Sequence, residues 1–223
     1  MAKGNIGLDI DLKETDLEIQ KMILKCFADT ISSAITKRVN SIESRLLGIL
    51  SNCIISSPEY QSVVSGQLRG EFGIVDSHSA LLRILNIWLN SIKVIPDPVR
   101  VSGSDLIGGL NITAIEADFS DVLSSSSASF VTEKGTKIPW LEWLLTAGTN
   151  IVVRDYKVST NLNNFNKASS RTGQAIMVAS SVQFYKVPAQ FAGTIDDNMV
   201  SRAILGVEDI ILDMIQEEVE KHI

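Results

Sequence analysis

A helical pattern of apolar residues covers residues 14–54 and constrains the fold more than any other feature of the chain. The apolar positions recur every three or four residues from Ile19 to Leu50, with polar residues between them. Thr15 and Glu18 have the spacing of a capping box at the start of a helix. The pattern predicts one long amphipathic helix, or two helices broken near residues 40–41. Its length exceeds what one small domain needs, so we expect part of it to pack against another subunit.

Composition limits the class of protein. A chain of 223 residues, 45% apolar and 21% charged, is typical of a folded soluble protein that buries a sizeable core. The net charge of −6 argues against a surface that grips nucleic acid, although it is compatible with a protein that lets DNA pass. No apolar run approaches the roughly 20 residues of a membrane span, and the first residues lack the apolar core of a signal peptide. We therefore expect a protein made in the cytoplasm with no membrane contact.

The order of patterns predicts an α+β fold in a single domain, residues 1–223. We expect helices packed on a small, mostly antiparallel sheet, with a long protruding β-hairpin arm and a C-terminal helix. The expected parts are a helical N-terminal region (14–92), a strand-rich region (93–190) that contains the hairpin arm (149–188), and a closing helix (198–222).

The stretch 138–194 contains the predicted arm. A short apolar helix forms its buried root, with Trp140, Trp143 and Leu144 as the root residues. Two strand-like runs, 150–158 and 175–187, flank a polar connection of about 15 residues, which is longer than ordinary hairpin loops.

Basic, amide and aromatic side chains mark the arm as a contact region. The candidate contact residues are Arg154, Lys157, Asn161, Asn164, Phe165, Lys167 and Arg171. Three interpretations stay open: a solvated tip, contact with nucleic acid in which Phe165 stacks on a base, and contact with an acidic neighbouring subunit.

The search for catalytic chemistry gives little. Neither histidine, His78 or His222, lies in a nucleophile motif. A small hydrolase would use the carboxylate cluster Glu116, Asp118 and Asp121. The two cysteines, Cys26 and Cys53, are predicted to be small buried hydrophobes in a reducing cytosol, because two Cys and two distant His are too few for a zinc site. We expect no catalytic residues, no metal and no cofactor.

Several runs of residues resemble a known group of proteins. They are P-W-L-E-W-L-L-T-A-G-T, S-R-T-G-Q-A-I-M, V-P-A-Q-F-A-G-T, N-M-V-S-R-A-I and S-G-Q-L-R-G-E-F-G-I. Over residues 58–215 the chain resembles virion structural proteins of tailed bacteriophages. Its layout is similar to that of neck, or head–tail joining (tail-completion), proteins.

The resemblance implies a non-enzymatic virion protein, assembled in the host cytoplasm. It implies a closed homo-oligomeric ring, on the order of six or twelve copies, between connector and tail proteins, with DNA passing through the lumen. The helical region 14–54 exceeds what the smallest neck proteins have, so tail terminator, connector adaptor and baseplate component remain alternatives. A small hydrolase is the alternative from a different class.

Overall fold

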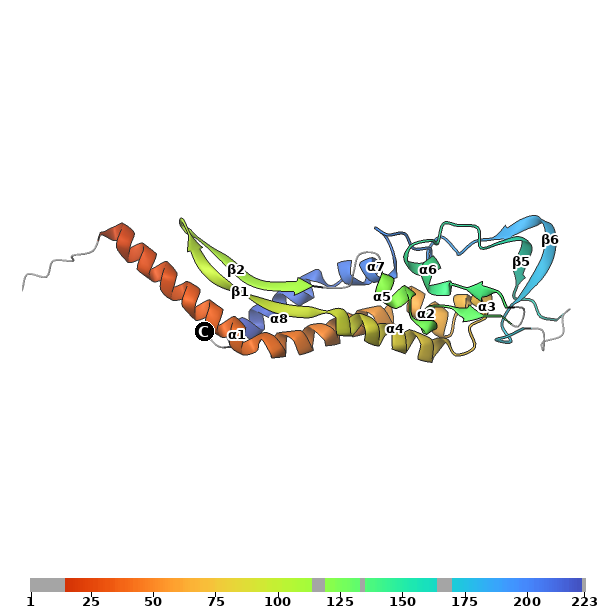
Figure 1. Cartoon of the computed structure of the whole chain (residues 1–223), viewed down its shortest axis with the longest axis horizontal. Helices are drawn as coiled ribbons and strands as arrows, with labels where there is room; N and C mark the ends of the chain where they lie inside the picture. Colours follow the sequence, from red (N-terminus) through yellow and green to blue (C-terminus); the bar gives the residue numbers. More distant parts are fainter. Residues whose placement is uncertain (1–14, 114–118, 133–134, 164–169, 222–223) are drawn as a thin grey trace, which may run out of the picture.

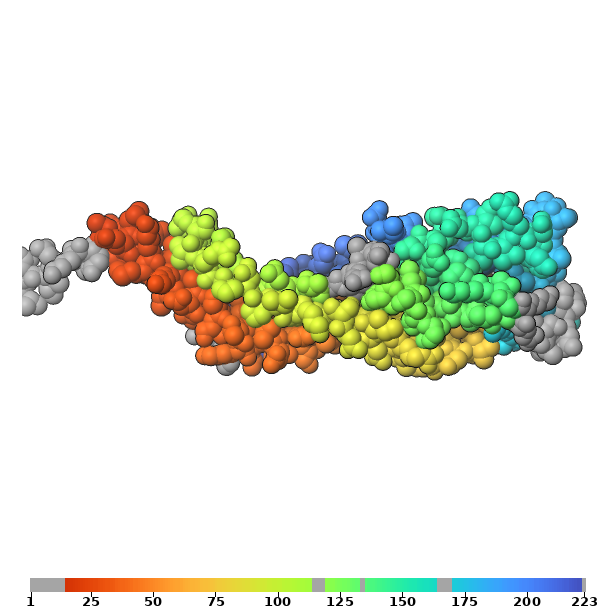
Figure 2. All heavy atoms as spheres, in the orientation of Figure 1, coloured from red at the N-terminus to blue at the C-terminus, as the bar shows by residue number. Residues whose placement is uncertain are grey.

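The computed structural model describes residues 15–113, 119–132, 135–163 and 170–221. The molecule is elongated, with a narrow stalk at one end and a broader head at the other (Figures 1 and 2). We call α1, β1, β2 and α8 the stalk, and the remaining elements the head. The predicted mixture of α and β structure is confirmed, and the described strands form three separate two-stranded antiparallel sheets rather than one sheet.

One unbroken helix, α1 (Asp16–Ser56), runs through the stalk into the head (Figure 1). The predicted capping box is confirmed: the Thr15 N–H donates to Glu18 Oε2 at 2.8 Å, and Thr15 Oγ1 accepts from the Glu18 N–H at 3.4 Å. The first buried residue of the helix is Ala28, so the turns before it make little contact with a core.

The hairpin of β1 (Lys93–Ser102) and β2 (Asp105–Thr113) lies along the first half of α1 (Figure 1). Its register shifts between Asp97 and Arg100, where Pro98 lacks an N–H for the ladder. The displaced Val99 N–H donates to Ser32 Oγ of α1 at 2.8 Å instead. The irregularity thus ties the hairpin to the helix.

The helix α8 (Glu208–Glu220) packs on the middle of α1 and completes the stalk (Figure 1). The stalk has its own apolar core, formed by Ile42, Leu46, Leu50, Ile92, Val94 and Met214. Beside it, the buried carboxylate of Glu218 accepts hydrogen bonds from Ser41 Oγ at 2.7 Å and from Arg45 Nη1 at 2.6 Å. Arg38 Nη2 and Lys221 Nζ each lie 2.8 Å from the same carboxylate.

The head surrounds a second, larger core. Its elements are α2 (Pro58–Val64), α3 (Gln67–Phe72), α4 (Ser77–Ser91), α5 (Ser120–Leu123), the 3-10 turn η1 (Ser126–Ala128), β3 (Phe130–Val131), β4 (Lys137–Ile138), α6 (Trp140–Leu145), β5 (Val153–Ser159), β6 (Ile176–Tyr185) and α7 (Met199–Leu205). Trp88 and Trp140 are the largest fully buried side chains, and Trp140 Nε1–H donates to the Ser127 carbonyl at 3.1 Å. An ion pair joins α2 to α7, because Arg202 Nε donates to the buried carboxylate of Glu59 at 2.8 Å.

The closing part of the chain differs from the prediction. The expected single helix over 198–222 is two helices, α7 and α8, which are separated at Gly206 and Val207. Asn198 caps the first of them, since its Oδ1 accepts from the N–H groups of Val200 and Ser201. The break lets α7 pack in the head while α8 packs in the stalk.

The long protruding arm over 149–188 is not confirmed. The strands β5 and β6 do pair as an antiparallel hairpin, but the pairing is interrupted between Arg154 and Tyr156, where Asp155 has a φ of +61°. Residues of both strands also line a cavity in the head. The hairpin is therefore partly integrated into the head.

The prediction that Cys26 is buried is wrong. Cys26 is exposed on α1 and Cys53 is half-buried, and both are free thiols. The apolar period that Cys26 shares with its neighbours indicates a packing face, but no described segment of the chain covers that face. In the residues that the structure describes, no helix is both long and apolar enough to cross a membrane.

Candidate subunit-contact sites

The sequence runs that carry the resemblance meet in the head. The two A-G-T runs, 147–149 and 192–194, lie against each other: the Gly148 N–H donates to the Gly193 carbonyl at 2.9 Å, and the Gly193 N–H donates to the Trp143 carbonyl at 3.1 Å. A Cβ at Gly193 would collide with the Leu144 carbonyl, and one at Gly148 would collide with the Trp143 carbonyl. Glycine is therefore required on both sides, because the two backbones touch.

A second junction joins α3 to the segment before β6. A Cβ at Gly70 would lie 3.1 Å from Cβ of Gln174 and 3.3 Å from Cβ of Ala175. The S-G-Q-L-R-G run thus packs against the S-R-T-G-Q-A run. Together the two junctions place α3, α6 and the β5–β6 hairpin around one cavity.

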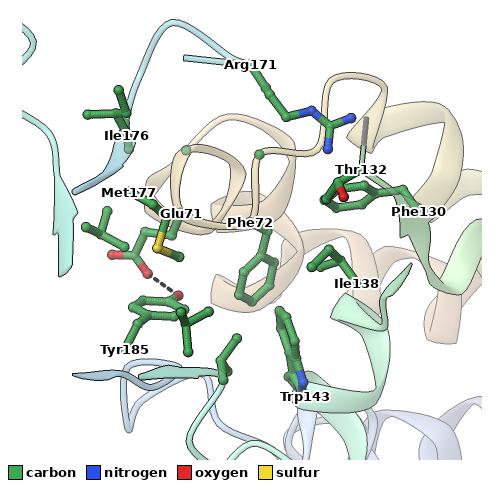
Figure 3. Close-up of a pocket in the computed structure, with 16 residues that line it drawn as sticks. Glu71, Phe72, Phe130, Thr132, Ile138, Trp143, Arg171, Ile176, Met177 and Tyr185 are labelled. Atoms are coloured by element: carbon green, nitrogen blue, oxygen red, sulfur yellow. Dashed lines mark hydrogen bonds between the residues drawn. The ribbon is translucent and has the colours of Figure 1, made fainter. Parts of the chain in front are cut away.

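This head cavity has a volume of about 400 Å³ and is lined mainly by apolar side chains (Figure 3). Phe72 of α3 and Trp143 of α6 meet edge to face in its floor, with ring centroids 5.3 Å apart. Ile138, Ile176 and Met177 line its walls. A cavity of this size and lining suits an apolar side chain of a binding partner.

Polar groups lie at the margins of the head cavity. On one side, Tyr185 Oη donates to Glu71 Oε2 at 2.7 Å (Figure 3). Burial raises the pKa of Tyr185 far above its ordinary value, and the hydrogen bond to Glu71 adds to the rise. On the other side, the Arg171 guanidinium lies 4.3 Å from the ring centroid of Phe130. The cavity therefore has a neutral phenol beside a carboxylate at one end and a cation at the other.

The structure divides the predicted contact residues. Arg154, Lys157 and Asn161 are exposed on or beside β5, and Arg171 is exposed at the rim of the head cavity. Asn164, Phe165 and Lys167 lie outside the described residues. The predicted root is buried at Trp140 and Leu144, whereas Trp143 is half-buried because one side of its ring faces the cavity.

The outer surface of the β5–β6 hairpin carries positive charge. We call the exposed residues Arg154, Lys157 and Lys186 the basic surface. The irregular pairing at Asp155 shifts the alternation of side chains along β5 by one residue. Arg154 and Lys157, which are three residues apart, therefore lie on the same face. Lys186 Nζ lies 5.6 Å from the ring centroid of the exposed Phe184, so the surface combines cations with apolar area.

An opposite charge gathers on the stalk, and the sequence reasoning missed it. We call the exposed residues Asp209, Asp213, Glu217 and Glu220 of α8 the acidic surface. Their spacings of four, four and three place them along one side of the helix. Asp209 lies in the first turn, where negative charge stabilises a helix, and Glu217 forms ion pairs with Arg45 and Lys221. Neither effect explains Asp213 and Glu220. The charge spacing on the polar face was the signal that could have identified it.

The hydrolase candidates are not brought together as a described site. Glu116 and Asp118 lie outside the described residues. Asp121 lies in the first turn of α5, and its Oδ1 accepts from the Val122 N–H at 2.7 Å. Within the described ranges, no group of three His, Cys, Asp or Glu residues is placed to hold a metal ion.

The chain matches no protein-family model, no curated protein and no solved structure.

Proposed function

We propose that the chain is a structural subunit of a tailed-bacteriophage virion, located in the neck where the head connector meets the tail. In this proposal, copies form a closed ring through which DNA passes, and the assembly has no catalytic role. The resemblance of the runs at 138–205 supports the neck, and their convergence in the head gives that resemblance a common location. The distribution of charge supports the proposed ring.

Opposite charges on two separate parts of one elongated molecule are the observation that carries the proposal. The basic surface is on the β5–β6 hairpin at the far end of the head, and the acidic surface is on α8 in the stalk (Figure 1). The two surfaces are too far apart to pair within one copy. Paired between copies, they make a heterologous contact, and heterologous contacts that close produce rings.

Apolar area adjoins both charged surfaces. Val182 and Phe184 of the hairpin have exposed fractions of 88% and 56%, and Leu212 of α8 has 64%. An interface needs such a desolvated centre, because exposed ion pairs alone contribute little to affinity. The head cavity beside the basic surface supplies a further pocket for a side chain of the neighbouring protein.

The net charge of −6 agrees with DNA passing through the lumen without being bound. A ring lined mainly by acidic groups repels phosphate, so DNA slides past it rather than adhering to it. No sequence-specific contact with DNA is part of the proposal.

A charge-swap experiment tests the ring. We expect Arg154→Glu combined with Lys157→Glu to shift the wild-type oligomer toward monomer, because acidic residues then face the acidic surface. Adding Asp209→Lys and Asp213→Lys should restore the oligomer. Mass photometry at several protein concentrations measures the state, and negative-stain images show whether the restored species are rings.

The matched control is Lys37→Glu, which reverses an exposed charge on α1 outside both surfaces. It should leave the oligomer unchanged. A wild-type chain that stays monomeric at every concentration, alone and with purified phage heads or tails, would overturn the proposal. Binding to DNA-filled heads before tails are added favours the neck, whereas binding to isolated tails favours the tail-terminator alternative.

A further inference from the structure

The head cavity is an apolar space that is partly open to solvent. Its volume of about 400 Å³ falls within the range of about 300–1,000 Å³ that is usual for ligand-binding pockets. Trp143 is half-buried because one side of its ring faces the cavity, whereas Trp88 and Trp140 are fully buried. An apolar group that enters the cavity removes this exposed apolar area from water, which favours binding.

Arg171 places a cation at the rim of the cavity. Its guanidinium lies 4.3 Å from the ring centroid of Phe130, and its Cδ lies 3.5 Å from the position of a Cβ at Gly73. These contacts hold the arginine at the rim, where it is exposed, and no described carboxylate pairs with it. A ligand with apolar side chains and a carboxylate beside them matches this arrangement.

The basic surface faces away from the cavity. Val153 and Val158 of β5 line the cavity, whereas the exposed Arg154 and Lys157 next to them do not. Successive side chains of a strand point to opposite faces, so the hairpin has the cavity on one face and the basic surface on the other. In the proposed ring, the acidic surface of a neighbouring α8 therefore covers the basic surface and leaves the cavity free.

Residues 6–12, I-G-L-D-I-D-L, combine the two chemistries that the cavity requires. The apolar residues occupy every second position: Ile6, Leu8, Ile10 and Leu12. Asp9 and Asp11 alternate with them. In an extended chain, this pattern places the apolar side chains on one face and the carboxylates on the other. The segment lies outside the described residues, shortly before the start of α1 at Asp16.

The segment is too short to reach the cavity of its own copy. The ten residues from Ile6 to Asp16 span at most about 35 Å. α1 begins at the end of the stalk that is far from the head, and its 41 residues extend for about 60 Å along its axis (Figure 1). The β5–β6 hairpin lies at the far end of the head (Figure 1). The segment therefore meets a cavity only in another molecule.

We propose that residues 6–12 of a second copy bind in the head cavity in an extended conformation, with their apolar face inside and their carboxylates beside Arg171. The contact joins the stalk end of one copy to the head of the next, so it is heterologous and compatible with a closed ring. The β5–β6 sheet has only two strands in the described ranges, which leaves an edge for backbone hydrogen bonds to the segment. The inference rests on the proposed function only in requiring a second copy.

A described segment with similar chemistry fits the cavity less well. Ile195 is 63% exposed and precedes two aspartates. It offers one apolar side chain rather than an alternating row, and Asp197 already pairs with Arg202 at 2.9 Å. The Asn198 side chain also donates to the Ile195 carbonyl at 3.1 Å, so this backbone is held in its turn.

A disulfide between copies tests the contact. In a chain with Cys26→Ser and Cys53→Ser, we expect Leu8→Cys combined with Met177→Cys to form a disulfide under mild oxidation, because Met177 lines the cavity. Every copy carries both new cysteines, so the products should form a ladder of linked copies on a non-reducing gel. In a closed ring, the ladder should end at the number of copies in the ring.

The matched control moves one cysteine out of the cavity. Val182 of β6 is 88% exposed and does not line the cavity. Leu8→Cys with Val182→Cys should form about a tenth of the linked product or less, because docking raises the effective concentration only at the cavity. Circular dichroism verifies that both variants fold. Equal yields would overturn the inference, since exposure alone would then set the reaction.

A labelled peptide tests the role of Arg171. The peptide is residues 4–14 with fluorescein, and the protein is the full chain with Leu8→Asp and Ile10→Asp, whose own segment no longer competes. Adding Arg171→Glu should weaken binding about five- to tenfold in fluorescence anisotropy. Lys137→Glu is the control, because it makes the same charge change at an exposed position that does not line the cavity. It should leave the affinity nearly unchanged.

A charge swap separates the ion pair from any change in the fold. A peptide with Asp9→Lys and Asp11→Lys should bind the Arg171→Glu chain more tightly than the chain that keeps Arg171. Binding should also shift the tryptophan emission to shorter wavelength, because Trp143 faces the cavity. Peptide binding that is insensitive to Arg171→Glu, or that leaves the emission unchanged, overturns the inference.

The outcomes distinguish this inference from the proposed function. Normal oligomers that form no ladder through Met177→Cys overturn the inference and leave the ring standing. A single, faster-migrating monomer band also overturns it, because the segment would then bind within its own copy. A chain that is monomeric under all conditions overturns both proposals.

Discussion

At Gly193 two segments of backbone approach so closely that a single methyl group would separate them. The Gly193 N–H binds the Trp143 carbonyl, and the Leu144 carbonyl occupies the place of a Cβ. No rearrangement of a flexible side chain can relieve this collision, since the obstructing atoms are backbone. The residue therefore matters for the close approach itself.

We predict that Gly193→Ala destabilises the protein by about 3 kcal/mol, because the added methyl group overpacks the junction of α6 with the segment before α7. Gly48→Ala is the matched control. Gly48 is exposed inside α1 with no atom within 4 Å of an added Cβ, so alanine there should stabilise by about 0.5–1 kcal/mol. Urea unfolding followed by circular dichroism measures both changes. A loss below about 0.5 kcal/mol at Gly193 would contradict the prediction.

Local chemistry was predictable at this scale and long-range contact was not. The capping box at Thr15 and Glu18 follows from four consecutive residues, and the structure contains it. The Gly148–Gly193 contact joins residues 45 positions apart, and nothing near either glycine in the sequence names its partner. Cys26 was placed in a core because its apolar period is that of a buried face, yet the described chain supplies no element to cover that face.

Between elements, the contact of α1 with α8 depends on one buried carboxylate. The Glu218 side chain is 3% exposed and is approached by Arg38, Arg45 and Lys221. Hydrogen bonds from Lys221, Ser41 and Arg45 hold the pKa of Glu218 at about 2, below its ordinary value of 4.5. The charged form of the carboxylate is thus stabilised by folding.

This lowered pKa predicts a loss of stability in acid. Because the folded-state pKa lies below the unfolded value, the contribution is complete above about pH 4.5 and is lost as the pH falls toward about 2. Glu218→Gln should lower the free energy of unfolding at pH 7 and reduce its fall between those two pH values. Urea titrations at a series of pH values measure this dependence.

The control for Glu218 is its neighbour. The side chain of Glu217 is 54% exposed, and its ion pairs with Arg45 and Lys221 face solvent. Glu217→Gln should therefore cost much less at pH 7. Equal losses from the two substitutions would show that burial does not set the strength of the Glu218 contact.

Elements with a clear period were predictable, and their boundaries were less so. The pattern of residues 14–54 predicted α1. The sequence predicts one closing helix because the helical spacing of apolar residues continues across Gly206. The helix breaks because α7 packs in the head core and α8 packs in the stalk core. The acidic surface of α8 does not follow from the apolar periodicity, because that periodicity gives no information on where charged residues lie.

Across the whole molecule, the head and the stalk have separate apolar cores that share α1 as their connection. All three tryptophans, Trp88, Trp140 and Trp143, belong to the head. Tryptophan fluorescence therefore reports on the head, while far-ultraviolet circular dichroism also reports on the helices of the stalk.

We predict that the two signals do not coincide during urea unfolding. Leu46→Ala, in the stalk core, should cost about 2–5 kcal/mol in the circular dichroism transition and leave the fluorescence transition near its wild-type midpoint. Leu141→Ala, in the head core, should move the fluorescence transition. Coincident transitions in the wild type and both variants would mean that the two cores unfold as one unit.

The elongated shape was the least predictable property. Composition and element order are compatible with a compact domain of 223 residues as well as with a head and a stalk. The arrangement depends on which apolar faces meet, for example Ile92 and Val94 with Met214 in the stalk. Those pairings join distant residues of similar chemistry, so the pattern of each segment alone leaves the choice open.

Because α1 is one continuous helix, it sets the rotational position of its residues relative to the head as well as their distance from the head. A single helix joins Phe27 to Leu50, so the number of residues between them sets the azimuth of the exposed Phe27 side chain relative to the head. One inserted residue would rotate Phe27 by about 100°, whereas seven would return it to within about 20°. In the proposed ring, this azimuth would decide which neighbour the side chain meets. A longer version of this stalk would therefore keep the same azimuth only if it grew by a nearly whole number of helical turns, for example by about 7, 11 or 18 residues.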